Sequence, residues 1–389
     1  MTDRRNGVSL VIGTILIVSA LSAGWSAGRL TPVTRGDSGG AGSLDRNTEE
    51  DAGNGVEGVS WDLPVTHNER VARFIDYLSQ GNRRNTAVWL ERQGRYAPLI
   101  QAELRRRGMP EDLLYLALIE SGLSPRAYSK AKASGMWQFI EETGQRYGLE
   151  VSGEVDERRD PIKSTAAALD YLQELYDRFG SWYLAAAAYN TGENRVERIL
   201  REREGGAKGD DELYWRIAPY LPKETRDYVP LMLAMGHIAK EPEKYGFHEL
   251  EYQEPLRFEV VWVPGATDLA TIAQAAGVAV DHVEELNLHL TKQRTPASRG
   301  WSVRIPEGSR NAFDRAFPEL FRTARLARAA DVQPAPKVIA ASAQKYHRVN
   351  RGDNLTVIAR RYGTSVRQIR SWNGISGSRI LPGQRLRVS

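Results

Sequence analysis

The hydrophobic positions of residues 61–250 follow a helical period. Val71, Phe74, Ile75 and Leu78 recur at the three- and four-residue spacing of one helix face, and similar segments follow along the chain. Glycine and proline residues separate these segments, as expected where helices begin and end. The pattern therefore predicts one all-α domain.

One of these segments is apolar almost throughout and carries a single acid near its end. Residues 112–122 form this run, Pro110 suits the first helical position, and Gly122 suits the left-handed conformation that ends a helix. Glu120 lies in the last turn. The negative end of the helix dipole and an apolar wall both disfavour the charged carboxylate and raise its pKa. Glu120 is thus a candidate general acid, although a solvated glutamate is the commoner occupant of such a position.

Beyond Pro255 the pattern changes to two copies of a short unit. Eight positions from Leu269 to Asn287 match eight positions from Leu355 to Asn373 at one constant offset. Each copy is predicted to form a strand, two helices and a second strand. The strands are expected at residues 258–263, 301–305, 346–349 and 385–388.

These patterns predict an α+β multidomain chain, in which a mostly α domain precedes two small βααβ modules. An N-terminal run, uncharged from Gly7 to Gly28 and preceded by Arg4 and Arg5, suits either a signal peptide or a membrane anchor. Export to the periplasm or cell envelope is expected in both cases, with attachment to the cytoplasmic membrane if the segment is retained. The predicted parts are residues 1–28, the targeting segment; 29–60, a flexible linker; 61–250, the helical domain; 256–307, the first module; 308–344, a helix and linker; and 345–389, the second module.

Composition narrows the chemistry. The absence of cysteine excludes disulfides, thiolate metal sites, a cysteine nucleophile and a lipid-modified cysteine anchor. The six histidines do not form a His-Glu-x-x-His motif, so no metal and no other cofactor is expected. The net charge of +4 comes without a block of Lys and Arg interleaved with aromatics, so no nucleic-acid partner is expected.

Motifs in the helical domain, in their order along the chain, resemble those of a known family. They resemble the soluble lytic transglycosylase domain, whose fold is like that of goose-type lysozyme, and most closely the membrane-bound lytic murein transglycosylase D family, which joins this domain to LysM modules. The motifs are Ile119-Glu120-Ser121, Ser129, Gly135-Met136-Trp137-Gln138, Ala188-Tyr189-Asn190 and Glu224-Thr225-Arg226-Asp227-Tyr228-Val229.

The resemblance implies the reaction and the substrate, which is the glycan strand of peptidoglycan. Glu120 would protonate the glycosidic oxygen between N-acetylmuramic acid and N-acetylglucosamine, and would then accept the proton of the muramoyl 6-hydroxyl as a 1,6-anhydro ring closes. A hydrolytic muramidase or chitinase would need a second carboxylate, for which Glu141, Glu142 and Asp160 are available, although helix-start and surface charges are the simpler interpretation. A wall-binding protein without catalysis is a further alternative.

The resemblance also implies a set of substrate-binding residues. Ser129 would lie near the acid, the missing side chain of Gly135 would let the sugar approach, and the amide of Gln138 would bind its N-acetyl group. Tyr228 would face the catalytic carboxylate, and Met136 suits substrate contact or core equally. The full expected set is Ser129, Gly135, Met136, Gln138, Tyr189, Asn190 and Tyr228, with the last two of the Ala188-Tyr189-Asn190 motif forming the cleft floor.

The second module resembles LysM, which binds glycans containing N-acetylglucosamine in a shallow groove between two loops. The first module departs from LysM because Ala266 stands in the place of Gly352 and the loop before its last strand is longer. Its Trp262 and Trp301 could stack on sugars but are expected in the core. The groove of the second module would be lined by Gly352, Asp353, Asn354, Thr356, Ile380, Leu381, Pro382 and Gly383.

Overall fold

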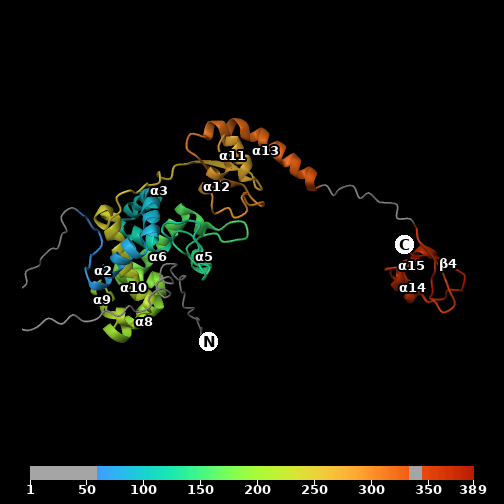
Figure 1. The fold of residues 1–389 in the computed structure, drawn as a ribbon, viewed down its shortest axis with the longest axis horizontal. Helices are drawn as coiled ribbons and strands as arrows, with labels where there is room; N and C mark the ends of the chain where they lie inside the picture. The colour runs from blue at the N-terminus through green and yellow to red at the C-terminus, as the bar shows by residue number, and fades with distance from the viewer. Residues whose placement is uncertain (1–58, 333–343) are drawn as a thin grey trace, which may run out of the picture. The chain divides into compact units, whose positions relative to one another are not determined.

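The computed structural model describes residues 59–332 and 344–389 of the chain (Figure 1). The chain divides into two compact units, Met1–Phe321 and Arg322–Ser389. No helix in the described part is long and apolar enough to cross a membrane. The targeting segment and most of the two predicted linkers lie outside the described residues.

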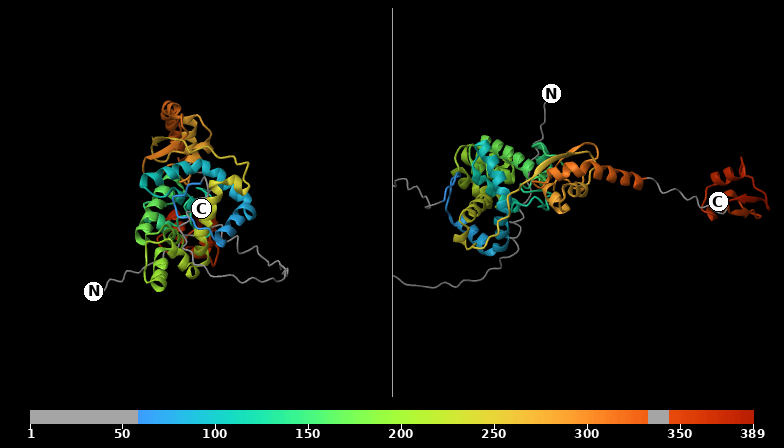
Figure 2. Two further views of the ribbon diagram at one scale, coloured as in Figure 1. Left: turned by 90° about the vertical axis from the view of Figure 1, so that its left-hand side faces the viewer. Right: turned by 90° about the horizontal axis from the view of Figure 1, so that it is seen from above.

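The predicted helical domain is confirmed, and α10 (Lys223–Lys240) lies at its centre. This helix packs against α2 (Glu69–Asp76), α4 (Leu114–Ser121) and α7 (Trp182–Thr191). Figure 2 shows the helices of this domain gathered in one compact group. The remaining helical elements are η1 (Tyr77–Gly81), α3 (Arg83–Arg107), η2 (Glu111–Leu113), α5 (Glu141–Arg146), η3 (Glu157–Arg159), α6 (Pro161–Phe179), α8 (Glu193–Glu204), α9 (Glu212–Ile217), η4 (Ala218–Tyr220) and η5 (Pro242–Tyr245).

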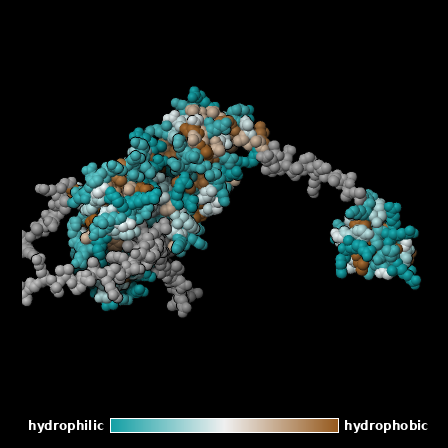
Figure 3. Space-filling model, in the orientation of Figure 1, coloured by the Kyte–Doolittle hydropathy of each residue, from teal (hydrophilic) through white to brown (hydrophobic). Residues whose placement is uncertain are grey.

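Local sequence explains where α6 and α7 begin and why they pack closely. Asp160 caps α6 by accepting hydrogen bonds from two backbone N–H groups, and Pro161 occupies the first helical position. The α7 helix is capped by Ser181 and contains four consecutive buried alanines, which allow close packing against α6. The exposed face in Figure 3 is mostly hydrophilic because such apolar runs are buried.

The start of α4 differs from the prediction in one respect. A 3-10 turn over Glu111–Leu113 precedes the α-helix, so Pro110 flanks that turn with a non-helical ψ of 130° instead of occupying the first helical position. The buried carboxylate of Asp112 anchors this turn, since it accepts from Asp62 N and pairs with Lys240 Nζ at 2.6 Å. The beginning of α4 is therefore fixed to the end of α10.

The two repeats form the same unit, as predicted. Each folds as a strand, two helices and an antiparallel partner strand. The matched asparagines make the same hydrogen bonds in both copies. The side-chain amide of Asn287 bonds to the backbone N–H and carbonyl of Arg304, and that of Asn373 bonds to the same two groups of Arg387. The first module comprises β1 (Glu259–Val263), α11 (Leu269–Ala276), α12 (Val280–Leu286) and β2 (Trp301–Ile305); the second comprises β3 (Tyr346–Arg348), α14 (Leu355–Arg361), α15 (Val366–Asn373) and β4 (Arg385–Arg387).

A helix predicted after the first module is also present, as α13 (Arg310–Val332). Its first turns belong to the core of the first module, because Phe313 is buried there and Phe317 packs against the same cluster. Further along, Leu326 is exposed.

The first module is attached directly to the helical domain. Val155 of the helical domain forms a β-bridge with Leu290 and is buried in the core of the module. Backbone hydrogen bonds run from Asp156 N to His289 O at 2.8 Å and from Thr291 N to Glu154 O at 3.1 Å. The module and this part of the helical domain therefore share one apolar core.

Candidate active site

Glu120 is fully buried in the last turn of α4. Burial is the largest influence on its carboxyl and raises the pKa from 4.5 to about 8. An apolar wall was one of the two expected causes, beside the helix dipole, and the burial of every α4 residue from Leu114 to Glu120 supplies it. At neutral pH Glu120 therefore holds a proton, which a general acid requires.

Tyr228 is the hydrogen-bond partner of Glu120. It comes from α10, and its hydroxyl donates to Glu120 Oε1 over 2.6 Å. This bond favours the carboxylate and partly opposes the effect of burial on the pKa of Glu120. The second oxygen, Oε2, is buried and has no hydrogen-bond partner among the described residues. That atom is the one available to a substrate oxygen.

Glu224 is a second carboxylate near the site, and sequence reasoning did not single it out. Its negative charge raises the pKa of Glu120. Glu224 accepts from Asn190 Nδ2 at 3.3 Å, while Asn190 Oδ1 accepts from Thr225 Oγ1 at 2.8 Å. The available signal was its position four residues before Tyr228, one helical turn away on the same face of α10.

The segment after α4 folds back on itself to form a small loop structure. Isolated bridges join Tyr128 to Ser134 and Ser134 to Phe139. Buried Arg158 holds this loop, because its guanidinium donates to the carbonyl oxygens of Lys132 and Phe139 and pairs with Asp156 at 2.8 Å. A buried guanidinium with all of these partners fixes a loop that has little regular secondary structure.

Gly135 has a steric reason for being glycine. A Cβ at this position would lie 1.7 Å from the carbonyl oxygen of Arg158, and the residue has a φ of +83°. The family resemblance explained this glycine by the approach of a sugar. The contact with Arg158 explains it by the packing of two backbone segments.

Gln138 is held in a strained and buried conformation. Its φ is +48°, in the left-handed region that a residue with a side chain rarely adopts. Its Nε2 donates to Gly135 O at 2.8 Å, and its buried Oε1 lacks a hydrogen-bond partner within the described residues. An unpaired buried amide oxygen is suited to accept from an N–H group, such as that of an N-acetyl substituent.

Ser121 connects α4 to this loop, a role not predicted from the sequence. Its hydroxyl donates to Met136 O at 2.8 Å and accepts from Ser124 N. Met136 itself is fully buried in the apolar core, which favours the core interpretation of its side chain. Ser129 caps a turn by accepting from Ala133 N at 3.1 Å.

Tyr189 and Asn190 lie at the end of α7 and are both buried. The Tyr189 hydroxyl donates to Trp137 O at 2.8 Å, and the charge of Glu120, after burial, raises the pKa of the Tyr189 phenol. Tyr189 therefore lies in the electrostatic surroundings of Glu120. The structure thus brings Tyr189, Asn190 and Tyr228 to the same region as the acid.

The three carboxylates weighed as a hydrolytic base are placed elsewhere in the fold. Glu141 and Glu142 are exposed in the first turn of α5. Asp160 caps α6 and pairs with Arg304 at 2.8 Å. None of the three is among the groups that shift the pKa of Glu120. Across residues 59–332 and 344–389, no group of three or more His, Cys, Asp or Glu side chains is arranged to hold a metal ion.

The expected groove residues of the second module differ in their exposure and in their structural partners. Asp353 and Asn354 have local structural partners, since Asp353 pairs with His347 at 2.8 Å and Asn354 caps α14. Ile380 is half-buried against the core of the module. The exposed residues of the set are Gly352, Asn354, Thr356, Leu381, Pro382 and Gly383.

Comparison with known proteins identifies two domains in this chain. Residues 97–211 match the model of the transglycosylase SLT domain, and residues 347–389 match that of the LysM domain. The chain carries an SLT domain and a LysM domain. The resemblance drawn from the motifs is confirmed, and the mostly helical, lysozyme-like SLT domain with a small strand-containing LysM region agrees with the predicted fold class.

Individual relatives extend the similarity beyond these two domains. The chain is 33% identical over 294 residues to membrane-bound lytic murein transglycosylase D of Escherichia coli, an alignment covering 75% of this chain and 63% of that protein. It is 24% identical over 177 residues to membrane-bound lytic murein transglycosylase C of Yersinia pestis, covering 38% and 49% of the two chains. The solved 70 kDa soluble lytic transglycosylase of Escherichia coli aligns with 22% identity and a TM-score of 0.33, covering 47% of this chain and 32% of that one.

Proposed function

We propose that the SLT-domain chain is a peptidoglycan lytic transglycosylase that cleaves the β-1,4 bond between N-acetylmuramic acid and N-acetylglucosamine without water. The observation that carries the proposal is the buried Glu120, whose carboxyl keeps its proton at neutral pH and presents one unpaired oxygen. The similarity to lytic murein transglycosylases over three quarters of the chain supports the same assignment.

In the first step Glu120 acts as a general acid. Its proton passes from Oε2 to the glycosidic oxygen, the C1–O bond breaks, and positive charge develops at C1 of the muramoyl ring. Tyr228 orients the carboxyl through Oε1 and stabilises the carboxylate that remains. Gln138 Oε1 accepts from the N-acetyl N–H of a bound sugar and so fixes the ring beside the acid.

In the second step the same carboxylate acts as a base. It takes the proton of the muramoyl 6-hydroxyl as that oxygen bonds to C1, which closes the 1,6-anhydro ring and returns the enzyme to its protonated form. Glu224 contributes through its charge, because a neighbouring negative charge makes Glu120 a stronger base. This cycle needs no second proton-transferring carboxylate.

A hydrolytic muramidase or chitinase remains the competing function, and Glu224 is the residue that it would use. Hydrolysis needs a base or nucleophile in addition to the acid, and Glu224 is the carboxylate whose charge acts on Glu120. The exposed Glu141 and Glu142 and the ion-paired Asp160 are less suitable. A wall-binding protein without catalysis would have no use for a buried, protonated glutamate.

The LysM domain would hold the enzyme on the glycan strands of the cell wall. A second weak contact with the same polymer raises the effective concentration of substrate at the first. The corresponding location is the periplasmic side of the cell envelope, and retention of residues 1–28 would add an anchor in the cytoplasmic membrane. Peptidoglycan glycan strands would be the partner at both sites.

The decisive experiment is digestion of purified peptidoglycan with residues 59–389, followed by mass spectrometry of the products. Transglycosylation should give muropeptides one water lighter than hydrolytic ones, without reducing muramic acid ends. Glu120→Gln should give no products, whereas Glu224→Gln should slow the reaction and leave the anhydro products unchanged. Reducing ends that disappear in Glu224→Gln would establish hydrolysis instead.

A further inference from the structure

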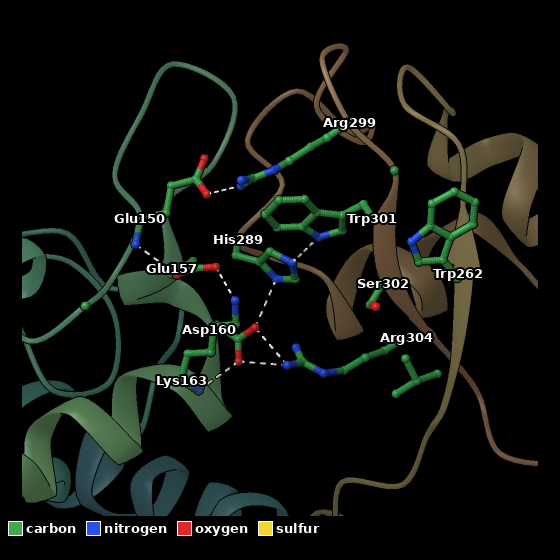
Figure 4. A pocket seen from close by; sticks show the side chains of 13 residues that line it. Glu150, Glu157, Asp160, Lys163, Trp262, His289, Arg299, Trp301, Ser302 and Arg304 are labelled. Atoms are coloured by element: carbon green, nitrogen blue, oxygen red, sulfur yellow. Dashed lines mark hydrogen bonds and ion pairs between the residues drawn. The ribbon is translucent and has the colours of Figure 1, made fainter.

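A pocket of about 570 Å³ lies between the first module and the helical domain (Figure 4). One wall is the outer face of the two-stranded sheet, with Trp262 on β1 and Ser302 opposite it on β2. The other wall is the segment 157–163, which contains η3 and the start of α6. None of the motif residues around Glu120 lines it. It also differs in place from the groove expected of a LysM fold, which lies between loops.

Trp262 is the prominent side chain of this pocket. The expectation that Trp262 belongs to the core is wrong, because 68% of the residue is exposed. Its indole lies against Gly300, where a Cβ would come within 1.9 Å of the ring. Glycine thus lets the ring pack against the backbone on one side while the rest of the indole stays open. A tryptophan fixed in this way offers a flat, preorganised apolar surface.

The charged groups of the pocket are paired with one another. Arg299 pairs with Glu150, Lys163 with Glu157, and Arg304 with Asp160, as Figure 4 shows. Each pair joins the two walls or lies within the helical wall, and the charges balance. Such a pocket has no excess charge to attract an ion, but it offers many hydrogen-bonding atoms around one apolar face.

Behind these side chains, one hydrogen bond and one close His–carboxylate contact link Trp301, His289 and Asp160. Trp301 Nε1 donates to His289 Nε2 at 3.3 Å, and His289 Nδ1 lies 3.3 Å from Asp160 Oδ2. Burial lowers the pKa of His289 to about 4, so the ring is neutral and the tryptophan bond places its proton on Nδ1, facing Asp160. The ring of Trp301 is further covered by the guanidinium of Arg299, 4.7 Å from its centroid.

We propose that this pocket binds one N-acetylhexosamine ring of a glycan strand, stacked on the indole of Trp262. The apolar C–H face of a pyranose matches the open indole, and its hydroxyl and amide groups match the charge-balanced, hydrogen-bonding surroundings. A volume of about 570 Å³ falls within the range of small-ligand pockets and accommodates a single sugar ring with its substituents. The choice of an amino sugar rests on the proposed function; the stacking site does not.

The pocket is joined to the loop that carries Gln138. Arg158 lies between two pocket residues, Glu157 and Asp160, and its carbonyl oxygen contacts Gly135 while its guanidinium binds the carbonyls of the loop. A sugar bound on Trp262 therefore rests on the segment 157–163. Arg158 of this segment also holds the loop after α4, which carries Gln138. Occupation of the pocket would hold the glycan on the same compact unit that contains the acid.

The test uses the full chain carrying Glu120→Gln, so that the probe is bound but not cleaved. The probe is the tetramer of N-acetylglucosamine, and the readout is the indole N–H signal of Trp262 in a two-dimensional NMR spectrum, assigned by its loss in Trp262→Ala. Addition of the tetramer should shift this signal in a saturable way. A Trp262 signal that stays unmoved while signals elsewhere saturate would overturn the proposal.

Two further variants separate stacking from general effects. Gly300→Ala keeps the indole of Trp262 but displaces it. In this variant the dissociation constant for the tetramer, measured from the Trp262 signal, should rise at least tenfold. Tyr220→Ala removes another exposed aromatic, which lies on η4 outside the pocket, and should leave that constant unchanged. Equal affinity in Gly300→Ala and its parent would contradict the stacking site. Circular dichroism checks that each variant is folded.

The binding test is independent of the reaction. Wild-type digestion that yields reducing ends, together with a saturable shift of Trp262, would reject the proposed transglycosylation and leave the pocket established. Anhydro products together with an unmoved Trp262 signal would support the proposed transglycosylation and reject the sugar site at Trp262.

Discussion

At Glu120, a hydroxyl and a carboxylate act in opposite directions on the same proton. Burial, the largest effect, disfavours ionisation of Glu120, and the negative charge of Glu224 acts in the same direction, whereas Tyr228 favours ionisation by donating to Oε1. The resulting pKa of about 8 lies close to neutral, where a single group can give up a proton and take one back in the same catalytic cycle.

Removing the Tyr228 hydroxyl should change the pH profile in a specific direction. In Tyr228→Phe the carboxylate loses its donor, so the pKa of Glu120 should rise above 8 by roughly one to two units, the equivalent of one charge-assisted hydrogen bond. The alkaline limb of kcat/KM should move to higher pH by this amount, and kcat should fall by up to about 100-fold because the carboxyl is less well oriented.

The matched control for this prediction is Tyr214→Phe. Tyr214 is equally buried, but its hydroxyl donates to the backbone carbonyl of Arg226 at 2.8 Å and does not touch Glu120. Its loss should cost stability without moving the alkaline limb. A limb that moves equally in both variants would show that the pH dependence does not report Glu120.

The buried acid should also affect stability in a pH-dependent way. Glu120 has a pKa of about 8 when folded and near 4.5 when unfolded, so between these values the unfolded chain gives up a proton that the folded protein keeps. Stability contributed by this group is thus complete below pH 4.5 and lost as pH rises towards 8. The pKa difference, at roughly 1.4 kcal/mol per unit, limits the loss to about 5 kcal/mol.

Glu120→Gln should therefore melt close to the wild type at pH 4.5 and clearly above it at pH 8. The side-chain amide that replaces the carboxyl in this variant can still accept the hydrogen bond from Tyr228 through its oxygen. Thermal unfolding followed by circular dichroism at both pH values measures the difference. A melting advantage that is the same at pH 4.5 and pH 8 would rule out the raised pKa.

The residues of the site were predictable to different degrees. Glu120 and Tyr228 were identified through their motifs, and structure places them in contact. Glu224 lay in the same motif but had no distinguishing surroundings in the sequence, because its influence depends on how α10 packs against α4. Trp262 was assigned to the core because tryptophan is usually buried, and its exposure depends on a module contact that periodicity does not show.

Among the elements, helices and strands were predictable, whereas the loop between α4 and α5 was not. The amphipathic periods and the two repeats predicted the helices and the four strands, and the predicted strand boundaries lie within a few residues of those observed. The loop is held by buried polar contacts of Ser121 and Arg158 with backbone carbonyls. Contacts of this kind leave no periodic trace in a sequence.

Gly135 allows the rigidity of this loop to be measured. Gly135 and Gly148 have almost the same φ, +83° and +82°, but a Cβ would meet the Arg158 carbonyl at 1.7 Å in the first case and nothing within 4 Å in the second. Gly148→Ala should cost about 1 to 2 kcal/mol, which is the price of a left-handed conformation. Gly135→Ala should cost several kcal/mol more or prevent folding, because backbone must move.

Urea unfolding of both variants provides the measurement. Peptidoglycan cleavage should be lost in Gly135→Ala even where the protein remains folded, since displacement of the loop moves Gln138. Similar free energies of unfolding for the two variants would show that the loop yields easily and that Arg158 does not fix it.

At the scale of the whole molecule, the two compact units indicate that different parts of the chain cleave the glycan and hold the enzyme on the wall. Deletion of the residues after Gln344 removes the second module and leaves the helical domain and first module intact. Binding to insoluble wall should fall at least tenfold, because one of two linked contacts is lost, while cleavage of short soluble glycans should stay within about twofold. Sedimentation with purified wall and a soluble-glycan assay measure the two effects. Equal losses in both assays would place the second module in the active site.

The placement of Val155 in the core of the first module has a consequence for how such chains can be rearranged. A recombination event that replaced residues 256–307 with an unrelated module would leave Val155 without its apolar neighbours and Asp160 without Arg304. Successful exchange would have to carry the segment around residues 150–160 along with the module, although a hundred residues separate them. Among the described residues, the apolar core of the second module contains only residues between Val349 and Val388, so a copy of this module can be gained or lost without a matching change in residues 150–160.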